Sequence, residues 1–285
     1  MKEIMKKNKK ASRTNYGAMV FLILGLSAVI FPLYIAIVVS LKAPSDMTLD
    51  VAGLLSLPSK FIFSNYAEAI RVTDFWRSMA NSLFITIATV VLSIVIHSLA
   101  GYVIGRGMAK RKTFKFCYLY IISGMFVPFA LLMLPLIKQM ARLGLANQGG
   151  VILGYLVFFM PMNILLYTGY LKNVPITLDE AGYIDGTNTW GTFWKIIFPV
   201  MSPMHATVAI LTALGTWNDV MLPLILMGGS GVNTLPLAQL TFQTQFGTNY
   251  NLAFASYILA LVPIVIFYLI CQRKIINGVM SGSIK

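Results

Sequence analysis

The chain has 285 residues, of which 58% are hydrophobic and 11% are charged. A soluble globular domain is roughly 45 to 50% apolar, so this composition argues against that class and predicts a membrane protein. The net charge of +13 is also compatible with nucleic-acid binding, and the positions of the basic residues decide between the two classes.

Six long apolar segments follow one another along the chain. A membrane-spanning helix needs about 20 mostly apolar residues. Four segments reach that length without an Asp, Glu, Lys or Arg, at 17–41, 78–105, 116–137 and 149–171. A fifth, at about 199–226, contains one acidic residue, Asp219, and a sixth lies at about 252–271. The segments are continuous and do not alternate with a period of two, which predicts an all-α membrane protein with six transmembrane helices and not a barrel. Residues 227–251 also lack charge but are rich in Gly, Thr, Asn and Gln, which predicts a loop outside the membrane.

The basic residues are distributed unevenly between the two sides that six helices define. Sixteen of the 22 Lys and Arg residues fall in the two terminal tails and in the loops after the second and fourth segments. By the positive-inside rule these parts are cytoplasmic, so both termini face the cytoplasm. The basic N-terminal tail is then an orientation signal that also contacts membrane lipid, and no nucleic-acid partner is predicted.

A multi-pass protein of the cell membrane is therefore expected, in three parts. They are a basic cytoplasmic tail at 1–16, a six-helix transmembrane domain at 17–272 with a cytoplasmic loop at 172–198, and a cytoplasmic C-terminal tail at 273–285.

The motifs of the common catalytic and metal sites are absent from the sequence. There is no G-x-x-x-x-G-K-[ST] loop, so any dependence on ATP has to come from a partner. Neither H-E-x-x-H nor C-x-x-C occurs, and the two histidines, His97 and His205, stand alone within apolar segments. We therefore predict no catalytic residue, no metal site and no cofactor in this chain.

The loop at 172–198 collects acidic residues, which are scarce elsewhere. Three of the nine acidic residues, Asp179, Glu180 and Asp185, lie within seven positions there. Thr177 and Glu180 have the spacing of a capping box, which predicts a helix that starts at Thr177. Gly186 suits the left-handed conformation that ends a short helix.

A second short helix is predicted after this glycine. Either Thr187 or Thr189 caps it. Its apolar residues recur at helical spacing before Pro199 opens the fifth segment; they are Trp190, Phe193, Trp194 and Ile197. Two helices joined at a glycine form a compact structure, which we expect to dock on something. One alternative is a hairpin that lies on lipid headgroups. Anionic lipid repels an acidic helix, which favours a basic groove on a cytoplasmic protein.

Six positions of this loop follow a fixed spacing: Glu180-Ala181-Gly182, then Gly186, Ile196 and Pro199. The spacing resembles the "EAA" loop of permease subunits of binding-protein-dependent ABC importers, which reads E-A-A, three residues, G, nine residues, I-x-L-P. Two positions depart from that pattern, because Gly182 replaces the second Ala and Phe198 replaces Leu.

Shorter motifs extend the resemblance to nearly the whole chain and narrow it to the carbohydrate-uptake branch, with its smaller maltose-permease-like subunit. They are Asn65-Tyr66, Asn81-Ser82, Leu99-Ala100-Gly101-Tyr102 with Arg106, Trp217-Asn218-Asp219 with Pro223, Gln272-Arg273, Asn277-Gly278 and Gly282-Ser283-Ile284-Lys285.

The resemblance implies the type I ABC importer permease fold and a translocation role without enzymatic activity. It also implies a heterodimer with a second homologous permease subunit, two ATP-binding subunits that hold ATP and Mg, an extracellular solute-binding protein, and a sugar substrate, expected to be an oligosaccharide. The helix at Thr177 would be the coupling helix; the implied ATPase-coupling residues are Thr177, Asp179, Glu180, Ala181, Gly182, Asp185, Gly186, Ile196 and Pro199. In the C-terminal tail, Asn277, Gly278, Gly282 and Ser283 would reach toward the ATPase subunits.

Trp217, Asn218 and Asp219 are the candidates for the substrate pathway. An isolated acidic residue in a span marks a functional site by default. Two roles stay open for Asp219: contact with the sugar or the binding protein, and a structural hydrogen bond with Asn218 or a neighbouring helix. The main alternative function is an ATPase-independent secondary transporter or channel, and a third is a membrane scaffold. Such carriers usually place acidic or polar residues in several spans, whereas this chain offers Asp219 alone.

Overall fold

The computed structural model describes the backbone of residues 16–46, 53, 55–244 and 247–283, with side chains up to 242 and at 249–269. The chain divides into two compact units. The first unit holds the residues up to Ala69 together with Phe242–Leu259, and the second holds Ile70–Thr241 together with the residues from Ala260 onward. Helices dominate both units, as the composition predicts.

In the described residues the elements follow one another as a chain of helices with one two-residue ladder. They are α2 (Tyr16–Ser40), η2 (Pro44–Asp46), α4 (Ser64–Val72), α5 (Phe75–Gly107), α6 (Lys112–Ser123), η3 (Gly124–Phe126), α7 (Phe129–Arg142), α8 (Gln148–Leu171), α9 (Thr177–Ile184), α10 (Thr189–Thr192), the π-helical turn η4 (Phe193–Ile197), α11 (Phe198–Val200), α12 (Ser202–Asn218), α13 (Met221–Met227), α14 (Leu235–Gln239), η5 (Leu240–Phe242), the antiparallel strands β1 (Gln243–Thr244) and β2 (Gly247–Thr248), and α15 (Tyr250–Ser283).

Asn65 holds the first unit together where α2 ends. Its side-chain amide donates to the carbonyl oxygens of Ser40 at 2.9 Å and Lys42 at 2.8 Å. The Asn251 amide of α15 donates to the Asn65 side-chain oxygen at 3.3 Å, and the Tyr66 hydroxyl lies 2.7 Å from the Ser40 hydroxyl. The Asn65 amide thus donates to backbone carbonyls where α2 ends, and its side-chain oxygen and the Tyr66 hydroxyl bind side chains of α15 and α2.

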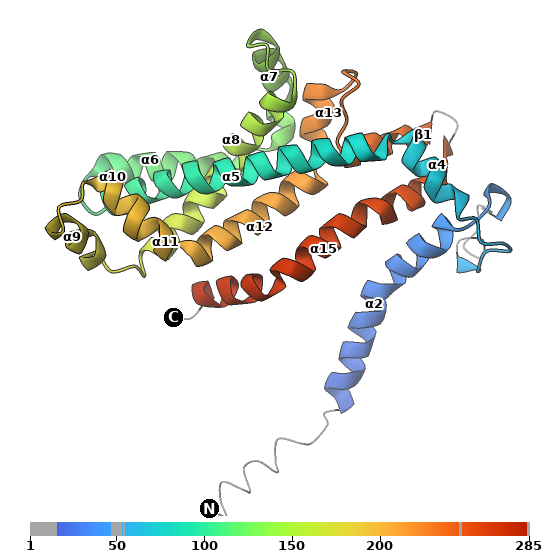
Figure 1. The fold of residues 1–285 in the computed structure, drawn as a ribbon, viewed down its shortest axis with the longest axis horizontal. Helices are drawn as coiled ribbons and strands as arrows, with labels where there is room; N and C mark the ends of the chain where they lie inside the picture. Colours follow the sequence, from blue (N-terminus) through green and yellow to red (C-terminus); the bar gives the residue numbers. More distant parts are fainter. Residues whose placement is uncertain (1–15, 47–52, 54, 245–246, 284–285) are drawn as a thin grey trace, which may run out of the picture. The chain divides into compact units, whose positions relative to one another are not determined.

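Three long helices of the second unit, α5, α8 and α12, lie side by side (Figure 1). Their contact faces carry small polar side chains among the apolar ones; those buried on α5 include Ser78, Ser82, Thr86, Thr89, Ser93 and Ser98. Helices in a membrane gain no hydrophobic free energy from packing against one another, so small residues that allow close approach are typical of their interfaces.

Four helices are long and apolar enough to cross a membrane: Tyr16–Ser40, Phe75–Gly107, Gln148–Leu171 and Tyr250–Leu269. They coincide with the first, second, fourth and sixth predicted segments. Two bent helix pairs bring the number of candidate spans to six if each pair counts as one, within the part of the chain that the structure describes. The number of spans and their orientation remain predictions.

The third and fifth segments are not the single straight helices expected. The third bends by 104° between Lys112–Phe126 and Phe129–Arg142. Pro128 lies at that break with extended backbone angles, and a proline there cannot continue the ladder of the preceding helix. The fifth segment was expected at about 199–226. In the structure α12 starts at Ser202, and Asp219, in extended conformation, ends it before α13.

Part of the predicted loop at 227–251 is held against α5 by two hydrogen bonds. The Asn81 side-chain amide donates to the carbonyl of Asn233 at 2.9 Å, and the Ser82 hydroxyl accepts from the Leu235 backbone N–H at 2.8 Å. Leu235 is buried. The Asn81-Ser82 motif of α5 therefore fastens the start of α14.

The predicted C-terminal tail is a helical continuation of α15 as far as Ser283. Beyond residue 269 the structure describes only the backbone. The role of the tail residues therefore stays a prediction; they are Asn277, Gly278, Gly282 and Ser283.

Candidate functional site

The acidic loop folds into two short helices with a glycine between them. Helix α9 begins at Thr177, where the sequence predicted a helix start, and ends at Ile184. Gly186 has a φ of +77°, in the left-handed region that favours glycine. The backbone N–H of Gly186 donates to the carbonyl of Tyr183 at 3.1 Å. Both predicted features of the first helix, its start and its left-handed end, are confirmed.

The predicted capping interactions are wrong at both helices. Thr177 makes no capping hydrogen bond, because Ile176, already in helical conformation, precedes α9. The carbonyl of Ile176 accepts from the N–H of Glu180 at 3.1 Å, so the helix begins from a backbone turn. The second helix is capped by Asn188, whose side-chain oxygen accepts from the N–H of Gly191 at 2.8 Å, and not by a threonine.

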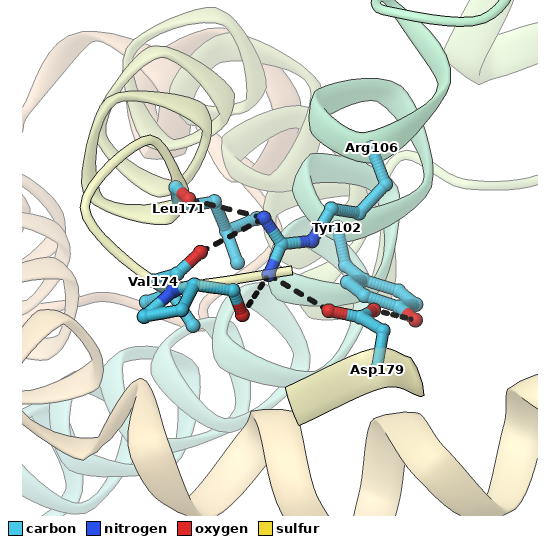
Figure 2. Close-up of polar contacts among 6 residues, drawn as sticks. Tyr102, Arg106, Leu171, Val174 and Asp179 are labelled. Atoms are coloured by element: carbon cyan, nitrogen blue, oxygen red, sulfur yellow. Dashed lines mark hydrogen bonds and ion pairs between the residues drawn. The ribbon is translucent and has the colours of Figure 1, made fainter. Parts of the chain in front are cut away.

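Asp179 points into the protein and not outward (Figure 2). Its carboxylate forms an ion pair with the Arg106 guanidinium of α5, with 2.8 Å between Oδ2 and Nη2. The Tyr102 hydroxyl, also from α5, donates to Asp179 Oδ1 at 2.7 Å. Asp179 is only 6% exposed, so its charge is used within the chain. The three acidic residues therefore do not form one interface cluster.

Arg106 also binds the end of α8. Its Nη1 donates to the carbonyl oxygens of Leu171 at 3.3 Å and Val174 at 3.0 Å, and its Nη2 donates to that of Pro175 at 3.4 Å (Figure 2). Carbonyls at the end of a helix have no intrahelical partner, and a guanidinium is well suited to satisfy them. One side chain thus ties α5, the end of α8 and α9 together. We call Tyr102, Arg106 and Asp179 the clamp.

The clamp residues of α5 were noted in the sequence only as part of a motif. Arg106 is the first charged residue after a long uncharged segment. The first charge after an apolar segment indicates the membrane boundary, but the partner of Arg106, 73 residues later, becomes visible only when the helices pack.

Gly182 is where α9 contacts the second helix. A Cβ atom at this position would lie 2.8 Å from the Thr192 hydroxyl and 3.0 Å from Cδ1 of Ile196. Thr187 reinforces the contact, since its hydroxyl donates to the Gly182 carbonyl at 2.7 Å and lies 2.8 Å from that of Thr192. The departure from the family pattern at Gly182 therefore matches the close packing here.

The outer surface of the loop carries both acidic and apolar side chains. Glu180, Ala181 and Asp185 are exposed on it. The large apolar or aromatic side chains exposed beside them are Ile176, Tyr183, Ile184 and Trp190. Ile184 is 86% exposed, which is unusual for an isoleucine on an ordered helix. Exposed apolar patches with a polar rim mark interaction sites, so this surface, the docking face, can bind a protein that offers basic and apolar groups.

The second half of the loop packs inward. Phe193 and Ile197 are buried, in a cluster with Tyr102 of α5 and Tyr167 of α8. The rings of Tyr102 and Phe193 have centroids 5.3 Å apart. Pro199 lies exposed in α11, after the π-helical turn. The docking face is therefore carried by a structure fixed to the helices at two points, the clamp and this aromatic cluster.

The structure separates the three candidates for the substrate pathway. Trp217 lines an almost entirely apolar cavity between α5, α12 and α15. Asn218 is exposed and donates to the carbonyl of Leu214 at 2.9 Å. Asp219 turns toward α8, where Oδ2 accepts from the Tyr155 hydroxyl at 2.9 Å. Tyr155, which belongs to no motif noted in the sequence, is therefore the hydrogen-bond partner of Asp219 on α8.

Residues 97–280 match the family described as "Binding-protein-dependent transport system inner membrane component". That match covers more than half of the chain, including the clamp residue Arg106 and the docking face. The chain belongs to this family. It is accordingly a membrane protein with several spanning helices and a component of a binding-protein-dependent transport system.

Two relatives match almost end to end. The multiple sugar-binding transport system permease protein MsmG of Streptococcus mutans is 38% identical over 97% of this chain and 100% of its own length. The probable starch degradation products transport system permease protein AmyC of Thermoanaerobacterium thermosulfurigenes is 32% identical over 90% of this chain and 92% of its own.

The fold is found in a solved transporter. A chain of a bacterial ABC transporter involved in the import of the acidic polysaccharide alginate superposes with a TM-score of 0.75 at 23% identity, over 92% of this chain and 98% of that one. At that identity the likeness concerns the fold alone.

Proposed function

We propose that this chain is the transmembrane permease subunit of an ATP-driven sugar importer and forms half of its translocation pathway. Family membership and the sugar permeases among its relatives support the transport role and the substrate class. In this proposal the chain crosses the membrane six times with both termini in the cytoplasm, as the distribution of its basic residues favours. Oligosaccharide is the favoured substrate, because one relative is named for starch degradation products.

The proposed partners follow from what the chain lacks and what it exposes. It has no P-loop, so two separate ATP-binding subunits would hold ATP and Mg. A second homologous permease would complete the pathway, and a solute-binding protein would deliver the sugar from outside. The docking face would bind the ATP-binding subunit, with the carboxylate of Glu180 meeting a basic group and Ile184 entering an apolar recess.

The observation that carries the proposal is the clamp. A docking face on a loose loop would move without moving the membrane helices. Here the buried ion pair between Arg106 and Asp179 joins α9 to the end of α5. When the ATP-binding subunits close, α9 would be displaced as a rigid body and α5 would follow. If the membrane helices have two stable packing arrangements, one inward-facing and one outward-facing, that displacement would shift the transporter from one to the other.

The test is a charge reversal on the docking face. Glu180→Lys should release the ATP-binding subunit from membranes and abolish uptake. The matched control is Lys112→Glu, which reverses an exposed charge on the same predicted side of the membrane but outside the docking face. Full uptake with Glu180→Lys would refute the docking assignment. Uptake that persists in membranes devoid of any ATP-binding subunit would instead favour the alternative, a secondary transporter or channel.

A further inference from the structure

The acidic loop meets α12 at a sharp corner. The helical stretch Thr189–Val200 and α12 are bent by 75° relative to one another, with the break at Met201. Pro199 and Pro203 lie on either side of the break, and a proline has no backbone N–H with which to continue a helical ladder. The N–H of Met204 donates to the Met201 carbonyl at 2.9 Å and not to the carbonyl four residues earlier, as an α-helix would require. The corner therefore leaves carbonyl groups of α11 to be satisfied by side chains.

His205 of α12 satisfies one of these carbonyl groups. Its Nε2 lies 2.9 Å from the carbonyl oxygen of Phe198, seven residues earlier in the chain. A carbonyl oxygen only accepts hydrogen bonds, so Nε2 carries the hydrogen, and Nδ1 of the neutral ring is then an acceptor. The ring of His205 also packs against that of Phe198, with 4.2 Å between the centroids. One side chain thus joins α12 to α11 across the bend.

Helix α8 holds the same corner with two tyrosines that lie on one face of the helix. The hydroxyl of Tyr167 is 2.8 Å from Nδ1 of His205 and donates to it when Nε2 carries the hydrogen. Tyr167 is fully buried, so its hydroxyl relies on a partner within the protein. The hydroxyl of Tyr170 donates to the Val200 carbonyl at 3.1 Å. Both carbonyl groups of the corner are therefore bound to α8, one directly and one through His205.

The other histidine of the chain, His97, has different surroundings. It lies on α5, and its Nδ1 is 3.0 Å from the side-chain amide of Asn163 on α8. Helices α5 and α8 are continuous and pack against one another, so this bond is one contact among many. His205 instead spans a place where the backbone ladder is interrupted. A hydrogen bond across such a break fixes an angle that the backbone by itself leaves free.

We propose that His205 is a positioning residue for coupling, which fixes the angle between the acidic loop and α12 through its bond to the Phe198 carbonyl. The proposal rests on the proposed function, because it assumes that an ATP-binding subunit moves the docking face. The clamp transmits a displacement of α9 to α5. His205 transmits a displacement of the second half of the loop to α12, and Tyr167 ties the ring to α8. With both connections in place, the three long helices α5, α8 and α12 receive the displacement together.

Three substitutions separate the two hydrogen bonds of His205. In His205→Gln the side-chain amide nitrogen can take the position of Nε2 and donate to the Phe198 carbonyl. In His205→Asn the shorter side chain can place its oxygen at the position of Nδ1 and accept from Tyr167, but it does not reach the carbonyl. His205→Leu keeps apolar volume and has neither group. The proposal predicts that Gln retains the fixed angle, and that Asn and Leu lose it.

The angle is measured by pulsed EPR on the complete transporter in lipid nanodiscs, with its native cysteines replaced. Spin labels at the exposed residues Lys195 and Leu211 lie on either side of the corner. In the unmodified chain and in His205→Gln, we expect one distance that ATP does not change, because the corner moves as a rigid body. In His205→Leu and His205→Asn, the fraction of molecules at other distances should rise about tenfold when ATP is added.

The matched control is Thr207→Val, two residues further along α12. The Thr207 hydroxyl donates to the carbonyl of Pro203 within the same helix, at 3.2 Å, so its loss should leave the distance unchanged with and without ATP. Melting temperatures are recorded for every variant. A general loss of stability would lower the melting temperature without the dependence on ATP.

Two results would overturn the positioning role. One is an unchanged distance in His205→Leu in the presence of ATP, and the other is an equal effect of His205→Gln and His205→Leu, which would mean that the ring acts by packing alone. If His205→Leu does not assemble, the comparison of Gln with Asn decides between the same outcomes. Co-purification of the ATP-binding subunits and their ATP hydrolysis are measured on the same samples. Their absence from the unmodified transporter would refute the proposed function, whereas their presence with an unchanged distance in His205→Leu would refute only the role of His205.

Discussion

Replacing Asp179 with Asn removes the charge that holds α9 against α5 while keeping the size of the side chain. In the structure the carboxylate is 6% exposed and binds two groups of α5, at 2.8 Å and 2.7 Å. Removing one partner of a buried ion pair costs about 3–5 kcal/mol. The Arg106 guanidinium keeps its carbonyl acceptors at the end of α8 and is 17% exposed, so part of that cost is recovered.

We therefore expect Asp179→Asn to weaken the attachment of α9 by about 2–3 kcal/mol. That free energy corresponds to about a 30- to 150-fold larger population of detached α9. The docking face is untouched by the substitution, so the ATP-binding subunit should still bind. ATP hydrolysis should then continue with less sugar transported per ATP, because α9 no longer moves α5.

Two measurements on the reconstituted transporter check this. Hydrogen exchange of the backbone amides in 177–184 should accelerate by a factor in that range, and the ratio of sugar imported to ATP hydrolysed should fall. Arg106→Gln should have similar effects on both measurements. The free energy lost in the double variant should be smaller than the sum of the losses in the two single variants, because both substitutions break the same contact.

The matched control is the exposed neighbour of the clamp, Glu180→Gln. It should weaken binding of the ATP-binding subunit and leave the protection of 177–184 unchanged, the reverse of the result for Asp179→Asn. If Asp179→Asn and Arg106→Gln leave both the amide exchange and the transport-to-hydrolysis ratio unaltered, the clamp is not the mechanical link.

Three further substitutions test the packing around the site. Gly186→Val places a β-branched residue at a φ of +77°, a strain of roughly 1–3 kcal/mol, and should impair transport; normal transport would count against the need for a left-handed turn. Gly182→Ala, although it restores the family pattern, puts a Cβ atom 2.8 Å from the Thr192 hydroxyl and should lower thermal stability by about 1–3 kcal/mol; a higher melting temperature would contradict the close packing. Ser82→Ala leaves the buried Leu235 N–H without its acceptor, at a cost of about 1–3 kcal/mol, and should speed amide exchange in 233–239; unchanged exchange would show that this bond does not hold the loop.

Local patterns predicted the helices of the loop at 172–198 but not the hydrogen bonds and the ion pair that hold them in place. The start of α9 and the left-handed Gly186 depend on neighbours within a few positions, and both were predictable. The caps were not, because Asn188 and Thr189 are almost equally suitable N-cap residues and only the path of the backbone selects one of them. The orientation of Asp179 was likewise inaccessible, since neighbouring carboxylates look alike in sequence until one of them meets a buried guanidinium.

The sequence by itself determined that the chain is a helical membrane protein and where most of its apolar helices lie, because spanning a bilayer requires a contiguous length of apolar residues. It also determined the family through the spacing of the loop. Only the tertiary structure decided that Asp179 belongs to the clamp, that Trp217 lines the cavity between α5, α12 and α15, and that Asp219 turns toward α8. These features depend on which residues from distant segments come into contact, and hydrophobicity, being a sum over neighbours in the chain, does not contain that information.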